Sequence, residues 1–227
     1  MAKPPSFAVI SVGDEIIEPG KTVEQFQIHP SNAWGIRAAL QALACPEVEL
    51  ATLPDKPDVI EKELTRLLAT RDGIILSGGV SRGKFDYVPD TLERLGVVVD
   101  FHRVNQKPGA PMWFGLAHGG KPVFALPGNP VSTMVCFHRY VKPFLLRCLG
   151  APDALVETTK LRSGVKQHPR LTLFLPVLRD ETGAQLQEYH GSGDYAALGE
   201  STGFVELPCG GENIPAGTTV RYHSWGI

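Results

Sequence analysis

The sequence predicts a three-layer α/β domain with a mostly parallel sheet, followed by a small all-β domain. From residue 6, apolar strand-like runs alternate with helix-length segments whose apolar residues recur at helical spacing. The strand-like runs are almost unbroken by polar residues, which indicates strands covered on both faces. After Gly150 the helical period disappears, and short strand candidates alternate with turn residues. We therefore expect an α/β domain over residues 1–150 and a β domain over 151–227.

The first half of the α/β domain contains three strands and two helices in alternation. The strands are FAVISV at 7–12, ELATL at 49–53 and GIIL at 73–76. The first helix runs from Ser31 to Ala44 and is expected to open on a Ser-Asn cap. The second runs from Pro57 to Ala69, where its leucines and Ile60 share one face.

The second half continues the same alternation. A helix is expected over Asp86–Leu95, and strands at 97–104 and 122–126 follow it. Asn129 and Pro130 occupy the N-cap and first positions of the last helix, which Gly150 closes. Pro143 inside that helix predicts a kink or an early end, because proline lacks the backbone donor.

The β domain is expected to be a small sandwich or barrel. Residues 151–153 form the junction, and 181–183 look like a hairpin connection. The strand candidates are Val156–Leu161, Leu171–Leu178, Ala184–Glu188, Phe204–Leu207 and Thr218–Tyr222.

Composition narrows the function classes. The 227 residues carry a net charge of -2, which gives no global reason to expect a nucleic-acid partner. No apolar stretch approaches the length that spans a bilayer, and the first residues lack a signal-peptide pattern. The four cysteines have no metal-type spacing and are expected to be free thiols, mostly packing residues. We expect a soluble cytoplasmic protein that binds small molecules.

Glycine, proline or charge follows each predicted strand, at the sheet edge where parallel folds bind ligands. The segment Ser77–Asp90 reads SGGVSRGKFDYVPD. Gly78 and Gly79 let the backbone approach an anion, and Ser77 and Ser81 offer hydroxyls. Positive charge is available from Arg82, Lys84 and Lys107. The Gly-Gly pair is equally compatible with a tight strand-to-helix turn, so both interpretations stay open at this point.

Acidic residues gather at the same strand ends. Asp14, Glu15, Asp55 and Asp86 could hold Mg²⁺ or orient a hydroxylated ligand. Each acid alone is better explained as a helix cap or a solvated loop residue, but their convergence at the strand ends favours function. Other polar and aromatic residues are weaker candidates for a functional site. His102 and His138 are expected to be packed or on the surface. Trp34, Met112 and Trp113 are expected in the core or at an interface.

Four motifs carry a family resemblance. SVGDEIIEPG, SGGVSRGKFDYV, VNQKPGAP and ALPGNPVS occur in the order and spacing of the molybdopterin molybdotransferases, which include the E domain of gephyrin. The chain resembles their C-terminal two domains only: the molybdopterin-binding fold and the small β domain. The resemblance implies that molybdate is inserted into adenylylated molybdopterin with release of AMP, that Mg²⁺ is required, and that the full-length enzyme is a homodimer.

The resemblance also implies roles for single residues. Asp86, Glu15, Asp55 and Lys107 match catalytic positions, and Asp55 and Asp86 match positions that hold the metal. Asp86 is the residue expected to act in ligand activation or in metal-assisted cleavage of the phosphoanhydride. The positions that match molybdopterin or molybdate binding are Gly78, Gly79, Ser81, Pro127, Gly128, Asn129, Pro130 and Ser192.

Several positions depart from the family pattern. Ala110 and Arg103 each stand where the family has a lysine, and Ala196–Ala197 replaces a serine pair. The helix start at 29–33 lacks an acid and an arginine, and Arg170 is the nearest counterpart of an arginine expected near Leu175.

These departures keep two alternatives open: a molybdopterin-nucleotide-binding module without full catalytic competence, and a molybdopterin adenylyltransferase. Two N-terminal domains of the family are also not in this chain. It is either a fragment of a larger protein or a natural short paralogue.

Overall fold

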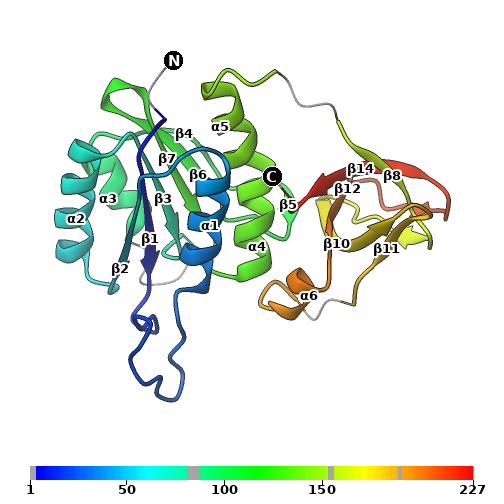
Figure 1. The fold of residues 1–227 in the computed structure, drawn as a ribbon, viewed down its shortest axis with the longest axis horizontal. Helices are drawn as coiled ribbons and strands as arrows, with labels where there is room; N and C mark the ends of the chain where they lie inside the picture. Colours follow the sequence, from blue (N-terminus) through cyan, green and yellow to red (C-terminus); the bar gives the residue numbers. More distant parts are fainter. Residues whose placement is uncertain (1–3, 81–86, 153–155, 189–190, 227) are drawn as a thin grey trace. The chain divides into compact units, whose positions relative to one another are not determined.

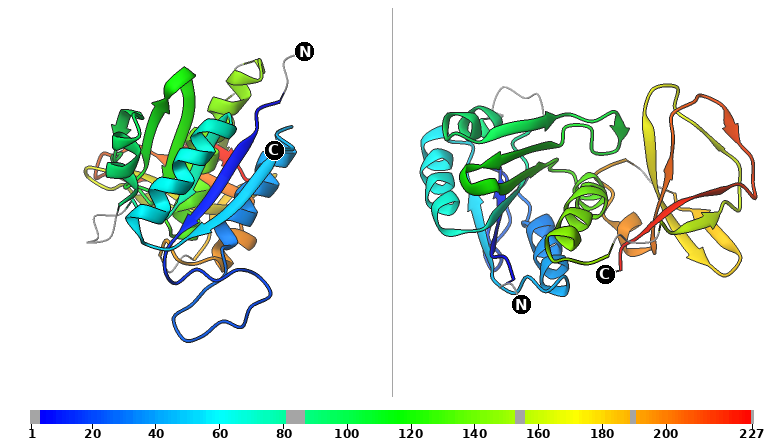
Figure 2. Two further views of the ribbon diagram at one scale, coloured as in Figure 1. Left: turned by 90° about the vertical axis from the view of Figure 1, so that its left-hand side faces the viewer. Right: turned by 90° about the horizontal axis from the view of Figure 1, so that it is seen from above.

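The computed structural model describes residues 4–80, 87–152, 156–188 and 191–226 (Figures 1 and 2). The chain divides into two compact units. The first consists of Met1–Val104 and Pro111–Gly128, and the second of Asn105–Ala110 and Asn129–Ile227. The sequence-based boundary after residue 150 stays a prediction. In the described part of the chain, every helix is too short or too polar to cross a membrane.

The first unit is built on a six-stranded sheet in the order β2-β1-β3-β7-β6-β4. Its strands are β1 (Phe7–Val12), β2 (Val48–Leu53), β3 (Gly73–Ser77), β4 (Val98–His102), β6 (Trp113–Ala117) and β7 (Lys121–Leu126). The first four strands in this order pair in parallel, whereas β6 pairs antiparallel with both β7 and β4. The prediction of a mostly parallel α/β sheet is confirmed, although β6 was not foreseen as a strand.

Helices cover both faces of this sheet, which gives the predicted three layers (Figure 1). Helix α1 (Ser31–Ala42) packs on β1 and β2, while α2 (Pro57–Thr70) and α3 (Val88–Arg94) lie on the opposite face. Alternation along β1 sends Ala8, Ile10 and Val12 into the core beneath α2 and α3. Trp113 and Met112 are fully buried, as expected of core residues, whereas Trp34 is 46% exposed.

Two predicted helix starts differ from the structure. The N-cap of α1 is Pro30, so Ser31 and Asn32 lie in the first turn and the Ser-Asn cap is wrong. Asn32 instead uses its side chain for contacts far along the chain. Helix α3 begins at Val88, and the predicted start at Asp86 lies outside the described residues.

The second unit contains a long helix that changes its winding. Helix α4 (Pro130–Cys136) passes through a π-helical turn (Phe137–Val141) into α5 (Lys142–Cys148). The helix therefore does not end at Pro143, and the irregular turn lies just before this residue, which cannot donate a backbone hydrogen bond. Gly150 closes the helix as predicted: its φ is 75°, its N–H donates to the Arg147 carbonyl, and the Ala151 N–H donates to that of Leu146.

The rest of the second unit is rich in β-structure. The main sheet has the order β11-β10-β12-β14-β8, and β5 also pairs with β10. Its strands are β5 (Gln106–Lys107), β8 (Thr158–Lys160), β10 (Thr172–Asp180), β11 (Gly183–Leu186), β12 (Gly203–Leu207) and β14 (Thr219–Ser224). The remaining elements are β9 (Val165–Lys166), β13 (Asn213–Ile214) and α6 (Ala196–Gly199). All five predicted strands are present, and β10 and β11 form the predicted hairpin, in which Asp180 pairs with Gly183.

Candidate functional site

The four parallel strands of the first unit end at the same level. Ser11 of β1 pairs with Thr52 of β2 and with Ser77 of β3, and Ser77 pairs with Leu126 of β7. Two backbone bonds extend this ladder into the loops: Gly13 donates to the Leu53 carbonyl at 3.0 Å and Gly78 to that of Leu126 at 3.1 Å. The loops after the strands therefore share one edge of the sheet, as the sequence predicted.

The glycine loop after β3 is possible only with glycine. Gly78 has a φ of 95°, and a Cβ atom on it would lie 2.4 Å from the Val12 carbonyl oxygen. Gly79 has a φ of 71°, and its Cβ would lie 2.7 Å from the Val88 side chain. Both backbones are thus left-handed and tightly packed. Ser81 and Asp86, the two remaining predicted residues of this loop, lie outside the described residues.

Two carboxylates meet at the ends of β1 and β2. The Asp55 backbone N–H donates to Asp14 Oδ1 at 3.1 Å, and the Asp14 N–H donates to Asp55 Oδ2 at 3.4 Å. This reciprocal pair fixes both acids at the sheet edge. Glu15 folds its carboxylate back over Gly13, where a Cβ would lie 2.5 Å from Glu15 Oε2. Within the described ranges, no group of three His, Cys, Asp or Glu side chains is arranged to hold a metal ion.

Asn32 joins the glycine loop to the loop after β7. Its Nδ2 donates to Ser77 Oγ at 3.0 Å and to the Gly128 carbonyl at 2.7 Å. Its Oδ1 is buried, with no hydrogen-bond partner in the part of the chain that the structure describes. The sequence interpretation treated Asn32 as a helix cap and missed this role. The sequence feature that could have indicated it is an amide side chain in the first turn of a helix, which can hydrogen-bond to neighbouring loops.

Pro127 and Gly128 lie on the same edge in the first unit. Pro127 is buried and Gly128 is exposed, and a Cβ on Gly128 would meet Gly78 Cα at 3.6 Å, an ordinary contact distance. The described site residues of the first unit are therefore close together: Glu15, Asp55, Gly78, Gly79, Pro127 and Gly128.

In the second unit, Lys107 ends strand β5, and the Gln106 side chain holds the loop that follows it. The Gln106 side chain is 2% exposed, and its Nε2 donates to the Pro108 carbonyl at 2.9 Å. Its Oε1 accepts a hydrogen bond from the Tyr140 hydroxyl. Burial raises the pKa of Tyr140 to about 12, so this hydroxyl keeps its proton at neutral pH. Lys107 itself is exposed.

Gly109 packs tightly beneath this loop. Its φ is 92°, and a Cβ on it would lie 2.6 Å from Cys136 Sγ and 2.7 Å from Gln106 Nε2. Burial raises the pKa of the Cys136 thiol, against a smaller opposing effect of the Gln106 hydrogen bond, so Cys136 is a packed thiol. The loop that follows Lys107 is thus tightly packed on its inner side.

Two predicted binding residues are hydrogen-bonded to each other in the second unit. Asn129 Nδ2 donates to Ser192 Oγ at 2.6 Å, and the Val131 N–H donates to the Ser192 carbonyl at 3.1 Å. Asn129 is the N-cap of α4 as predicted, but its side chain binds Ser192 and makes no cap hydrogen bond. Pro130 is the first residue of α4.

Residues 8–147 match the family described as probable molybdopterin binding domain. The chain belongs to this family of molybdopterin-binding domains. The matched range contains all the predicted site residues except Ser192, and it includes the described strand-end loops.

The relatives carry a more specific name. The chain is 36% identical to a molybdopterin molybdenumtransferase of Synechocystis, over 97% of its own length and 56% of the relative's. It is 31% identical to a molybdopterin molybdenumtransferase of Haemophilus influenzae, over 93% of this chain and 54% of that one. The resemblance found in the sequence is thereby confirmed, and the chain spans about half the length of the curated relatives it matches.

Solved structures agree with the fold. A molybdopterin biosynthesis MoeA protein from Pyrococcus horikoshii superposes with a TM-score of 0.85 at 29% identity, covering 98% of this chain and 55% of that one. Another MoeA structure, from Pyrococcus horikoshii OT3, gives a TM-score of 0.78 at 23% identity, with 98% and 54% coverage. The α/β fold with its β-rich extension is therefore that of these relatives.

Proposed function

We propose that this chain binds molybdopterin as part of a molybdopterin molybdenumtransferase that acts in molybdenum cofactor biosynthesis. The proposed reaction is insertion of molybdate into adenylylated molybdopterin with release of AMP. The observation that carries this proposal is the convergence of Glu15, Asp55, Gly78 and Gly128 at one sheet edge, in motifs of that enzyme family. The proposal extends to a cytoplasmic location and to a homodimer of the full-length enzyme.

The proposed roles follow from the local chemistry. The glycine loop presents backbone N–H groups to the phosphate or the pterin end of the ligand. Asn32 keeps that loop and the loop at Gly128 in fixed positions through its two hydrogen bonds. Glu15 and Asp86 are proposed as catalytic acids, Lys107 as a cation that stabilises negative charge, and Ser192 as a molybdate contact.

Mg²⁺ is proposed at Asp55 and Asp86. In proteins Mg²⁺ is held by one or two carboxylates together with substrate phosphates, and it keeps several waters. The Asp14 and Asp55 pair at the ends of β1 and β2 suits such a site, because the two carboxylates are adjacent and reach solvent. When bound, the ion would neutralise phosphate charge. The protein residues supply position and hydrogen bonds.

A binding module without turnover is the second candidate. It is favoured by Ala196 and Ala197, which stand at the start of α6 where the family resemblance expects serines. Ala197 is 1% exposed and its methyl group offers no hydroxyl to molybdate. An adenylyltransferase is less well supported, because the relatives' similarity extends over the β-rich part of the chain as well.

The deciding experiment measures AMP by chromatography after adenylylated molybdopterin, Mg²⁺ and molybdate are mixed with the chain and with the full gene product. Molybdate-dependent AMP supports the transferase, and Asp55→Asn is expected to lower its rate at least tenfold. Asp58→Asn, in the first turn of α2, is the matched control and should leave the rate unchanged. Calorimetric binding of adenylylated molybdopterin without molybdate-stimulated AMP would support the binding module, and absence of binding contradicts both.

A further inference from the structure

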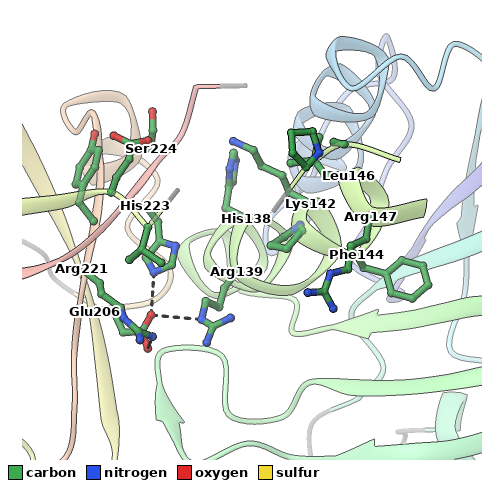
Figure 3. Close-up of a pocket in the computed structure, with 16 residues that line it drawn as sticks. His138, Arg139, Lys142, Phe144, Leu146, Arg147, Glu206, Arg221, His223 and Ser224 are labelled. Atoms are coloured by element: carbon green, nitrogen blue, oxygen red, sulfur yellow. Dashed lines mark hydrogen bonds and ion pairs between the residues drawn. The ribbon is translucent and has the colours of Figure 1, made fainter. Parts of the chain in front are cut away.

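A pocket of about 550 Å³ lies in the second unit, lined by the π-helical turn, by α5 and by strands β12 and β14 (Figure 3). This volume is in the range of small-molecule sites. None of its lining residues belongs to the molybdopterin site proposed above. Its wall contains apolar surface from Pro143, Leu146 and Tyr222 alongside charged side chains.

Positive charge dominates the lining. Among the described lining residues, the cations Arg139, Lys142 and Arg221 accompany two carboxylates, Glu157 and Glu206, a surplus of one positive charge when the histidines are neutral and Arg147 is left out of the count. The Lys142 ammonium donates to the Gly226 carbonyl at 2.6 Å, which fixes its position at the pocket. Such a surplus of cations in a partly enclosed space attracts an anion more strongly than it does in open water.

Glu206 organises several of these cations. It lies 2.8 Å from His223 Nε2, 3.4 Å from Arg139 Nε and 3.8 Å from Arg221 Nη1. The hydrogen bond from His223 and the nearby arginine charges hold the pKa of Glu206 below its usual value, against the opposing effect of burial. The carboxylate is therefore ionised at neutral pH, and it orients Arg139 and Arg221 at one wall of the pocket (Figure 3).

His138 adds a buried polar group without a partner. Its side chain lines the pocket, the residue is 4% exposed, and its Nδ1 has no hydrogen-bond partner among the described residues. The ring packs edge-on against Trp225 at 5.3 Å between centroids, so its orientation is fixed. Buried polar atoms in folded proteins are almost always hydrogen-bonded, so Nδ1 is available to a group that enters the pocket.

We propose that the pocket binds a small-molecule phosphate monoester with an apolar body. A phosphate monoester carries a charge of about -1.5 to -2 at neutral pH, so the positively charged lining attracts it. Lys142 and Arg221 bind the phosphate oxygens, and His138 supplies a hydrogen bond. The apolar wall at Pro143 and Leu146 accommodates the ester group, so inorganic phosphate alone leaves that wall unfilled.

Isothermal titration of the whole chain with phenyl phosphate, inorganic phosphate and benzyl alcohol at constant ionic strength tests this site. Phenyl phosphate is expected to bind at least tenfold more tightly than either partial probe. Lys142→Met should weaken it at least tenfold, whereas Lys160→Met, an exposed lysine of β8 outside the pocket, should not change it. If Lys142→Met does not fold, Arg221→Gln is the alternative variant and should also weaken binding of phenyl phosphate. The Arg221 side chain is 58% exposed, so its replacement is expected to leave the fold intact.

Three outcomes would overturn the proposal: no heat with phenyl phosphate up to millimolar concentration, equal affinity for phenyl phosphate and benzyl alcohol, or equal weakening by Lys142→Met and Lys160→Met. No readout in this experiment depends on molybdopterin chemistry, so its result is independent of the proposed function.

Discussion

Gly78 and Asn32 hold the strand-end loops by opposite means. Gly78 acts through the absence of a side chain, since a Cβ atom would lie 2.4 Å from the Val12 carbonyl. Asn32 acts through two hydrogen bonds to Ser77 and Gly128, residues 45 and 96 positions away. The glycine could be predicted from its place after an apolar run. The asparagine could not, because its partners are brought to it only by the completed sheet.

Gly78→Ala is expected to lower the free energy of unfolding by at least about 2 kcal/mol. A left-handed φ alone costs a non-glycine residue about 1 kcal/mol, and the contact with backbone at Val12 adds to that cost. The matched control is Gly20→Ala, because Gly20 has a φ of 90° with open space around it. Urea unfolding followed by circular dichroism measures both variants. Equal losses would show that the contact at Val12 relaxes without cost.

His138 is expected to make stability depend on pH between about 7.5 and 5. Burial, with smaller contributions from the charges of Lys142 and His223, lowers its pKa to about 3, whereas an unfolded histidine titrates near 6.5. The stability that the neutral His138 contributes is therefore complete above about pH 6.5. It is lost progressively as the pH falls toward the pKa of His138 in the folded protein. The free energy of unfolding should decrease by about 1.4 kcal/mol between pH 7.5 and 5.5.

His138→Phe is the variant that isolates this effect, because it keeps an aromatic ring and removes the titrating group. Its free energy of unfolding should lack that decrease over the same interval, measured by denaturant unfolding in matched buffers. Parallel pH profiles of the variant and the original protein would contradict the assignment to His138.

At the scale of elements, the two-residue strand β5 is joined to the long helix of the second unit by side chains. Gln106 receives the Tyr140 hydroxyl bond and donates to Pro108, and Gly109 packs on Cys136. The sequence pointed to Lys107 because of its motif. The burial of Gln106 could not be predicted from the local sequence, because β5 pairs with β10, which lies 65 or more residues further along the chain.

A double-mutant cycle on Gln106 and Tyr140 should reveal their coupling. Gln106→Leu preserves volume but leaves the Pro108 carbonyl without its side-chain donor, which costs about 1–3 kcal/mol. Tyr140→Phe is expected to cost about 1 kcal/mol alone and clearly less in the Gln106→Leu background. Thermal or urea unfolding of the four proteins provides the measurement. Strictly additive losses would mean that the hydroxyl bond contributes nothing to stability.

At the scale of the whole chain, periodic patterns were sufficient for the alternating part of the fold. Apolar runs predicted β1, β2, β3 and β7, and turn residues separated the five β-domain strands. The elements that were missed are β5, β6, β9, β13, α6, the short 3-10 helix His118–Gly120 and the π-helical turn. Strands β5, β9 and β13 have two residues each and depend on partners distant in sequence, so local pattern carries no signal for them. Strand β6, by contrast, pairs with its neighbours β4 and β7.

The four thiols offer a test of the packing of both units together. Cys45 and Cys136 are fully buried and burial raises the pKa of both, whereas Cys148 and Cys209 are exposed. Because the thiolate is the reactive form, a thiol reagent such as DTNB should titrate two groups rapidly in the native protein and all four in denaturant. A variant with Cys148→Ser and Cys209→Ser should show no rapid reaction and the remaining two thiols after unfolding. Rapid reaction of a third thiol in the native protein would mean that Cys45 or Cys136 becomes accessible by local opening, against the tight packing of Gly109 on Cys136.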